Sequence, residues 1–230
     1  MNRRLLTKHH LLLRSTTRPT LLHIDSSPLG EASISRHLTS EFVTSWKLAN
    51  PDGKVIVRDL TKSGLVTINA AWIGAAYTPE GSRTPEQKQA LALSDALVAE
   101  LAAADEYVIG VPMHNFGVPS VFKLWIDQIA RAGKTFAYVD GTPKGLLTGK
   151  KATFLIATGG IYGEGTAMAS FNFVEPYLRT VFGFLGVGDT TFQTAGGTAA
   201  LNYGASREEL LTPQLEAIRA RFAAESVAVN

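Results

Sequence analysis

The sequence contains no cysteine among its 230 residues. That absence excludes disulfides, thiolate zinc sites, iron–sulfur clusters and CxxC redox pairs. Any redox chemistry would therefore need a bound organic cofactor to carry the electrons. The chain also lacks a run of about 18 consecutive apolar residues, so we expect no membrane-spanning segment.

Several ligand-binding motifs are missing as well. No complete GxGxxG occurs, which argues against a tightly held dinucleotide, and no GxSxG elbow supplies a hydrolase nucleophile. The segment 145–151 superficially resembles a P-loop, but it has too few residues between its glycines and a lysine where magnesium would be bound, so we interpret it as a turn. No metal site is expected, because neither HxxxH nor HExxH spacing relates the histidines His9, His10, His23, His37 and His114. We expect His23 to be a core or edge residue of a strand.

Acidic residues are absent from the first 20 positions, which carry five basic ones. Removing these five from the 22 basic residues leaves 17 against 20 acidic residues, so the rest of the chain is slightly negative. The sequence pI of 8.8 therefore reflects a basic start, and we expect no nucleic-acid partner.

We predict a basic N-terminal extension over residues 1–19 and a single domain over 20–230. The arginine-rich, acid-free extension is typical of an organelle transit peptide. The alternatives are a disordered tail, a misassigned start and a surface strap. We expect a cytoplasmic protein, with organelle targeting by residues 1–19 as the alternative.

Short apolar runs alternate with amphipathic segments along the rest of the chain, whose hydrophobic content of 45% is enough for a core. Thr84, Pro85 and Gln87 predict a helix start with a capping box. Long excursions are expected over 60–83 and 133–149. We predict strands near 20–25, 54–59, 106–112, 152–157 and 190–194, and helices near 34–47, 84–104, 120–131, 173–185 and 207–223.

Five successive βα units predict an α/β fold with a five-stranded parallel sheet and helices on both faces. The natural strand order is 2-1-3-4-5. Ligands of such sheets bind beyond the carboxyl ends of the strands, so the loops after the first, third and fourth strands are the candidates.

The first of these loops, over 26–35, is rich in serine and opens a helix. A helix N-terminus offers unpaired N–H groups and partial positive charge, which suits a phosphate. Ser27, Ser33 and Ser35 add hydroxyls, and Ile34 adds an N–H group. The alternative is a serine-rich cap without a ligand.

The second loop, over 112–117, combines apolar side chains with one amide and one imidazole. Met113 and Phe116 can pack on a flat heteroaromatic ring, and Asn115 can bond along its rim. In the third loop, over 158–163, Gly159 and Gly160 allow close backbone approach. A simple turn is the alternative for each.

The motifs that carry a resemblance are Ser-Ser…Ser-x-Ser at 26–35, Leu-x-x-Ser-Asp-x-Leu-x-x-Glu-Leu at 91–101, Pro-Met-x-Asn-Phe at 112–116, Ala-Arg-Ala-Gly-x-Thr-Phe at 130–136, Gly-Leu-x-Thr-Gly-Lys-Lys at 145–151 and Gly-Gly-Ile at 159–161. In this order and spacing the chain resembles the FMN-dependent NADH azoreductase and quinone reductase family, from Leu21 to about Ala223. The resemblance implies a flavodoxin-like fold that holds FMN.

By this resemblance, Ser27, Ser33, Ile34 and Ser35 hold the FMN phosphate, and Met113, His114, Asn115, Phe116, Ala157, Thr158, Gly159 and Gly160 line the isoalloxazine. Asn115 and the N–H groups of Gly159 and Gly160 are the expected catalytic groups. The family often has arginine where this chain has Thr158, and tyrosine where it has His114.

The expected activity is two-electron reduction of quinones and azo compounds by NADH or NADPH, with ping-pong kinetics. We expect the substrate pocket to include Phe136, Tyr138, Tyr162 and Phe184, some of them from the second chain of a homodimer. The alternatives are a flavodoxin-type electron carrier without turnover of its own and a flavin-binding regulatory module.

Overall fold

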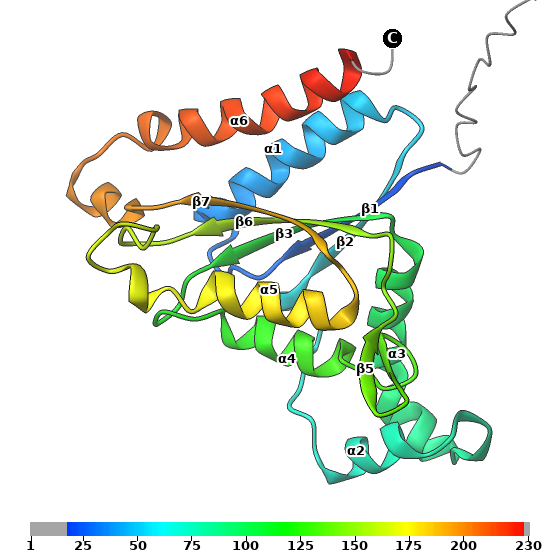
Figure 1. The fold of residues 1–230 in the computed structure, drawn as a ribbon. Coiled ribbons are helices and arrows are strands. Elements are labelled where there is room, and N and C mark those ends of the chain that lie inside the picture. The colour runs from blue at the N-terminus through cyan, green and yellow to red at the C-terminus, as the bar shows by residue number, and fades with distance from the viewer. Residues whose placement is uncertain (1–17, 228–230) are drawn as a thin grey trace, which may run out of the picture.

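The computed structural model describes residues 18–227 of the chain. Most of the expected N-terminal extension, residues 1–17, lies outside the described residues. The part that follows forms one layered α/β body, with a central sheet between two layers of helices (Figure 1).

The central sheet has five parallel strands in the order β2-β1-β3-β6-β7. All five strands were expected from the sequence. The labels differ from the expected 2-1-3-4-5 because an antiparallel hairpin, which the sequence reading missed, precedes the fourth sheet strand. The sheet strands are β1 (Thr20–Asp25), β2 (Lys54–Asp59), β3 (Glu106–Pro112), β6 (Lys151–Ala157) and β7 (Asp189–Ala195), and the hairpin strands are β4 (Phe136–Val139) and β5 (Thr142–Gly145).

Two helices cover one face of the sheet and three cover the other (Figure 1). Phe42 and Phe222 join the two helices of the first face, their ring centroids 4.9 Å apart at a nearly perpendicular angle. Trp125 and Phe182 belong to the buried cluster of the second face. The first layer contains α1 (Ile34–Ala49) and α6 (Arg207–Val227), and the second contains α3 (Pro85–Ala103), α4 (Ser120–Ile129) and α5 (Val174–Leu185).

The helix start expected at Thr84 is confirmed. The Thr84 hydroxyl accepts the Gln87 N–H, and the Gln87 side chain accepts the Thr84 N–H, which completes the capping box. Pro85 is the first residue of α3. Because this start was specified by local chemistry alone, it could be predicted to the residue.

The expected excursion over 60–83 contains a short helix, α2 (Ala70–Tyr77), that the sequence reading missed. The indole N–H of Trp72 donates to the Gln128 side chain at 2.9 Å, and the buried Arg131 guanidinium lies 5.4 Å from the Trp72 ring centroid. Arg131 also donates to the Ser94 hydroxyl. The motif at 130–136 thus ties α2 and α3 to the end of α4.

Candidate functional site

The loop between β1 and α1 forms a polar cradle. Ser27, Ser33 and Ser35 are all buried. Ser33 caps α1, because its hydroxyl oxygen accepts the Arg36 N–H at 3.3 Å and lies 3.2 Å from the Ser35 hydroxyl. The N–H groups of Ile34 and Ser35 lie in the first turn, where a helix offers no internal acceptor. The cradle therefore combines hydroxyls with free amides, a donor set suited to an anion.

The Arg36 side chain holds this loop through one of its carbonyl groups. Its Nε and Nη2 atoms donate to the Ser27 carbonyl at 2.8 and 2.7 Å, and Nη2 also donates to Asp59 at 2.8 Å. The hydrogen bond to Asp59 raises the pKa of Arg36 despite desolvation. Desolvation opposes the shift at Asp59 too, but hydrogen bonds from Arg36 and Thr61 leave the pKa of Asp59 below its usual value. Arg36 is thus engaged by these partners.

The loop after β6 is fixed in the same way, through its carbonyl groups. Backbone N–H groups of residues 197–199 donate to the carbonyls of Thr158, Gly159 and Gly160 at 3.0 to 3.1 Å. The Thr158 hydroxyl also donates to the Gly160 carbonyl at 2.8 Å. In the described part of the chain, the N–H groups of Gly159 and Gly160 donate to no acceptor. They remain available to a ligand.

Thr158 was expected to line the isoalloxazine, but its side chain is buried and bonded to the Gly160 carbonyl. It is not among the residues that line the cavity. An arginine placed there would have to break that bond and displace buried neighbours. The side chain at position 158 therefore supports the loop.

After β3 the chain makes a tight turn. His114 and Gly117 exchange both backbone hydrogen bonds, at 2.9 and 3.1 Å. Asn115 and Phe116 between them have φ angles of 48° and 69°, in the left-handed region. Asparagine tolerates that region, whereas Phe116 is strained by roughly 1–2 kcal/mol. Strain of this kind clusters at functional sites, which makes this turn a candidate functional element.

These loops enclose a cavity of about 370 Å³ at the carboxyl edge of the sheet. Eight expected residues line it: Ser27, Ser33, Ile34, Ser35, Met113, His114, Ala157 and Gly159. Four expected residues lie in the same loops but do not line it: Asn115, Phe116, Thr158 and Gly160. The structure thus brings the three predicted loops together at one cavity.

One wall of the cavity was missed from the sequence. It comes from the loop after β7 and consists of Thr198, Ala199, Leu201 and Asn202, while Leu29, Ala32 and Pro112 extend the predicted loops. The signal was present, because Gly196 and Gly197 follow the fifth strand, whose carboxyl end lies at the same edge as the others.

The aromatic residues expected in the substrate pocket form two separate groups. Phe136 lies 5.9 Å from Tyr138 and 4.7 Å from Phe184, between ring centroids, and this group joins the β4–β5 hairpin to the last turns of α5. Tyr162 lies instead 6.2 Å from Phe116, which also contacts Phe171 at 5.4 Å.

The two groups lie at opposite ends of the sheet. Since α5 connects two parallel strands, it runs against them, and its last residues lie where the strands begin (Figure 1). The hairpin packs there, because the Leu147 N–H donates to the Leu185 carbonyl at 2.9 Å. Phe136, Tyr138 and Phe184 of one chain therefore lie far from the cavity of that same chain.

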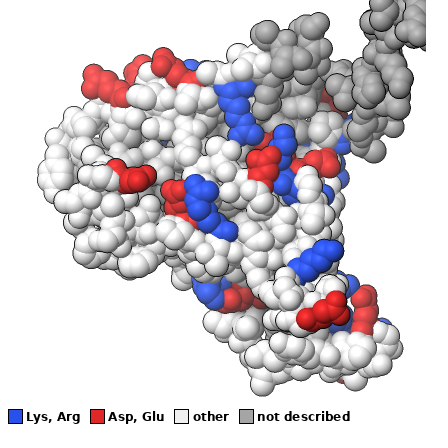
Figure 2. Space-filling model, viewed as in Figure 1, with Lys and Arg blue, Asp and Glu red and all other residues white. Residues whose placement is uncertain are grey.

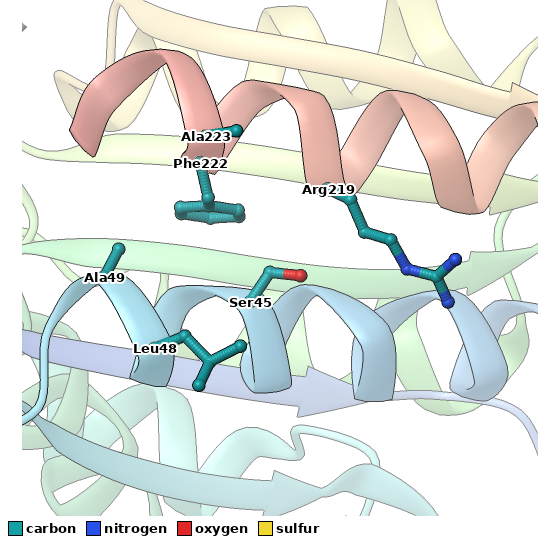
Figure 3. Close-up of a pocket in the computed structure, with 6 residues that line it drawn as sticks. All are labelled: Ser45, Leu48, Ala49, Arg219, Phe222 and Ala223. Carbon is teal, nitrogen blue, oxygen red and sulfur yellow. The ribbon is translucent and has the colours of Figure 1, made fainter. Parts of the chain in front are cut away.

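Charged side chains are mixed in sign on the face shown in Figure 2, and few lie over the loops at the carboxyl edge. Another, smaller cavity of about 260 Å³ lies between α1 and α6, where Leu48 and Phe222 help to line it (Figure 3). An ion pair between Arg219 and Glu41, 2.7 Å long, joins the same helices.

Within residues 18–227 no cluster of metal-binding side chains occurs, and no helix has the length and apolar character needed to cross a membrane.

Comparison with known proteins places the chain in a family. Residues 19–222 match the family described as having a flavodoxin-like fold. An FMN-dependent NADH:quinone oxidoreductase of Acidobacterium capsulatum is 59% identical over 201 residues, covering 87% of this chain and 97% of that protein. An FMN-dependent NADH:quinone oxidoreductase of Burkholderia lata is 52% identical, covering 88% of this chain and 99% of that protein.

A solved structure agrees with these relatives. The crystal structure of an azoreductase from Bacillus anthracis strain Sterne superposes with a TM-score of 0.79 at 29% identity, covering 89% of this chain and 98% of that one. The sequence motifs, the sheet order and these similarities agree, and the chain belongs to the flavodoxin-like family of FMN-dependent NADH:quinone oxidoreductases and azoreductases.

Proposed function

We infer that this chain is an FMN-dependent oxidoreductase that reduces quinones and azo compounds with electrons from NADH or NADPH. The observation that carries this inference is a single cavity. Uncharged donors suited to an anion lie at it, together with a glycine loop whose N–H groups are free. The relatives with this fold are quinone oxidoreductases and azoreductases by name. A carrier without turnover of its own is not favoured.

The donor set of the β1–α1 loop fits the FMN phosphate. Ser27, Ser33 and Ser35 supply hydroxyls, and Ile34 and Ser35 supply backbone N–H groups at the start of α1. Arg36, already engaged with Asp59 and the Ser27 carbonyl, positions the loop. In our proposal the phosphate is held by neutral donors and by the partial charge of the helix end.

The remaining residues of the cavity suit the ring system. FMN bound here would supply the capacity for hydride acceptance and two-electron transfer. Met113 and Ala157 offer apolar contact, and the N–H groups of Gly159 and Gly160 stabilise negative charge on the ring edge. The exposed amide of Asn115 bonds along the rim. Because one cavity serves both substrates in turn, the kinetics are ping-pong.

We propose that the working unit is a homodimer in which each cavity is completed by the partner chain. The separation of Phe136, Tyr138 and Phe184 from the cavity of their own chain supports this arrangement. So does an open apolar groove between α4 and α5, which Val118, Phe173, Pro176 and Tyr177 help to line. A twofold axis would give two equivalent sites.

The function is tested with the purified full-length protein. We expect flavin absorbance near ~450 nm that survives gel filtration, release of FMN on heating, and catalytic NADH oxidation with menadione or an azo dye. Flavin-free protein that oxidises neither nicotinamide would overturn the proposal.

We also propose a cytoplasmic location, with organelle targeting by the basic residues 1–19 as the alternative. Fractionation of cells that express the full chain or a chain beginning at Thr20 tests this. Different distributions of the two would contradict it.

A further inference from the structure

The first residue of α6, Arg207, reaches across to the phosphate loop, some 175 positions earlier in the chain. Its Nη1 atom donates to the Ala32 carbonyl at 3.0 Å, and its Nη2 atom donates to the Ser33 carbonyl at 3.2 Å. Nη2 also lies 3.5 Å from the Glu31 carbonyl oxygen. One guanidinium therefore engages three successive carbonyl groups of the loop that we propose for the FMN phosphate.

The direction of these carbonyls decides whether the loop attracts or repels an anion. Within one peptide unit, the carbonyl and the N–H of the next residue point in opposite directions. A carbonyl that is held away from the cavity therefore directs the next N–H toward the cavity. Ser33 is the capping residue of α1, and its carbonyl also accepts the His37 N–H at 3.2 Å. Because the Arg207 guanidinium donates to this carbonyl and to the preceding one, it fixes the backbone where α1 begins. Ile34 and Ser35 present their N–H groups there.

A helix cap orders the backbone at Arg207. The Ser206 hydroxyl oxygen accepts the Glu209 N–H at 3.2 Å at the start of α6. The preceding segment, Thr198–Tyr203, contributes four residues to the wall of the cavity. Arg207 thus joins the β7 wall of the cavity to the phosphate loop, and it does so without lining the cavity.

The two arginines at this loop differ in their acidic partners. Arg36 holds the Ser27 carbonyl and pairs with Asp25 and Asp59. Arg207 forms no ion pair with an acidic side chain in the described part of the chain. Its charge is therefore left to favour a phosphate in the cradle, in addition to the hydrogen bonds through which it shapes the loop.

We propose that Arg207 is a positioning residue for the phosphate of the flavin: it holds the carbonyls of residues 31–33 outward so that the start of α1 presents donors to the phosphate. The proposal rests on the proposed FMN site and assigns a role to a residue outside it. It predicts selectivity between FMN and riboflavin, which lacks the phosphate.

The experiment compares equilibrium release of FMN and of riboflavin, by free-flavin fluorescence, from full-length protein loaded with either flavin by dialysis. The variants are Arg207→Met, which keeps the length of the side chain but removes its donors and charge, and Arg207→Lys, which keeps the charge but not the fork. Arg219→Met is the matched control, because Arg219 lies on the same helix (Figure 3) and pairs with Glu41 on α1.

For Arg207→Met we expect the dissociation constant of FMN to rise about tenfold or more while that of riboflavin changes less than about twofold. Arg207→Lys should lie between Arg207→Met and the wild type. Arg219→Met should leave the ratio of the two constants unchanged.

Equal weakening of both flavins by Arg207→Met, in step with a lower melting temperature, would show a purely structural role and overturn the proposal. So would a wild-type ratio in Arg207→Lys, because charge alone would then suffice. The double change Ser33→Ala with Ser35→Ala separates this failure from that of the site. If the double change leaves FMN binding unaltered, the phosphate site itself is wrong. If the double change weakens FMN binding and Arg207→Met does not, only the role of Arg207 is wrong.

Discussion

The two ends of the cavity differ in how completely one chain builds them. At the phosphate end, the serines are buried, and the carbonyls of the loop after β1 are held by Arg36 and Arg207. The same chain also holds the loop after β6, through residues 197–199. At the ring end, the turn over Asn115 and Phe116 is exposed and left-handed. Three of the four aromatic residues expected in the substrate pocket, Phe136, Tyr138 and Phe184, lie at the far end of the sheet. One chain thus prearranges the phosphate cradle, whereas in our proposal the ring end is completed by the partner chain.

The largest effect is expected at the phosphate end. Ser33→Ala combined with Ser35→Ala removes two hydroxyls that would bond to the charged phosphate. Each such hydrogen bond is worth about 1.5–3 kcal/mol, so the dissociation constant of FMN should rise at least about 100-fold. A flavin titration measures this.

The control is Thr84→Ala, which also removes a helix cap but at α3, away from the cavity. Both variants should lose about 1 kcal/mol of unfolding free energy from the cap, yet the control should bind FMN normally. If the double variant binds FMN as tightly as the wild type does, the serine loop is not the phosphate end of the cavity.

The turn at the ring end is tested by a pair of substitutions at Asn115. Its φ of 48° suits glycine, whereas alanine there is strained by roughly 1–2 kcal/mol. If the amide bonds to the ring, Asn115→Gly and Asn115→Ala should both slow NADH-dependent turnover at least about tenfold while FMN remains bound.

The glycine variant is decisive, because it keeps the turn and removes only the amide. Normal turnover in Asn115→Gly together with slow turnover in Asn115→Ala would make Asn115 a turn residue. The melting temperature of the glycine variant should stay close to that of the wild type.

A smaller effect is expected at the hairpin. Tyr138 is 65% exposed in the single chain and makes an edge-to-face contact with Phe136. If it covers the ring in the partner's cavity, Tyr138→Ala should raise the KM for a quinone about fivefold to tenfold and leave thermal stability unchanged. Val139→Ala, on the opposite face of the same strand, is the matched control and should leave the KM unaltered.

The smallest effect concerns pH at the phosphate end. The pKa of Asp59 lies below its ordinary value of 3.8, so its pairing with Arg36 contributes stability that is present above about pH 4 and is lost as the pH falls through the lowered pKa. Solvent screening limits the contribution to about 0.5 kcal/mol.

Urea unfolding between pH 6 and pH 3 measures this contribution. Asp59→Asn should show a shallower loss of stability on acidification than the wild type. Parallel curves for the two proteins would show that the Asp59 pairing adds nothing.

Local chemistry explains which elements the sequence predicts well. The cap at Thr84 and the apolar run of β3 depend on neighbouring residues, and the buried serines of the first loop follow from its place at a helix start. Since all parallel strands end at one edge, the three predicted loops had to meet there.

Features that depend on distant contacts could not be predicted. Arg207 contacts carbonyls about 175 positions away, and nothing local marks it. Thr158 was assigned to the cavity from its neighbours in sequence, but its side chain bonds to the Gly160 carbonyl. The short strands β4 and β5 and the apolar helix α2 are positioned by packing that sequence periodicity does not report.

The claim that each cavity draws its phosphate end from one chain and part of its ring end from the other is tested by mixing two defective chains. One carries Ser33→Ala with Ser35→Ala, the other carries Tyr138→Ala, and co-expression with different tags isolates the mixed dimer. The account predicts that the mixed dimer has one intact site, formed by the normal loop of one chain and the normal Tyr138 of the other. Assayed without added FMN and with quinone well below its KM, it should therefore keep about half the quinone reductase activity of the wild type. Activity no higher than the average of the two parent variants would contradict it.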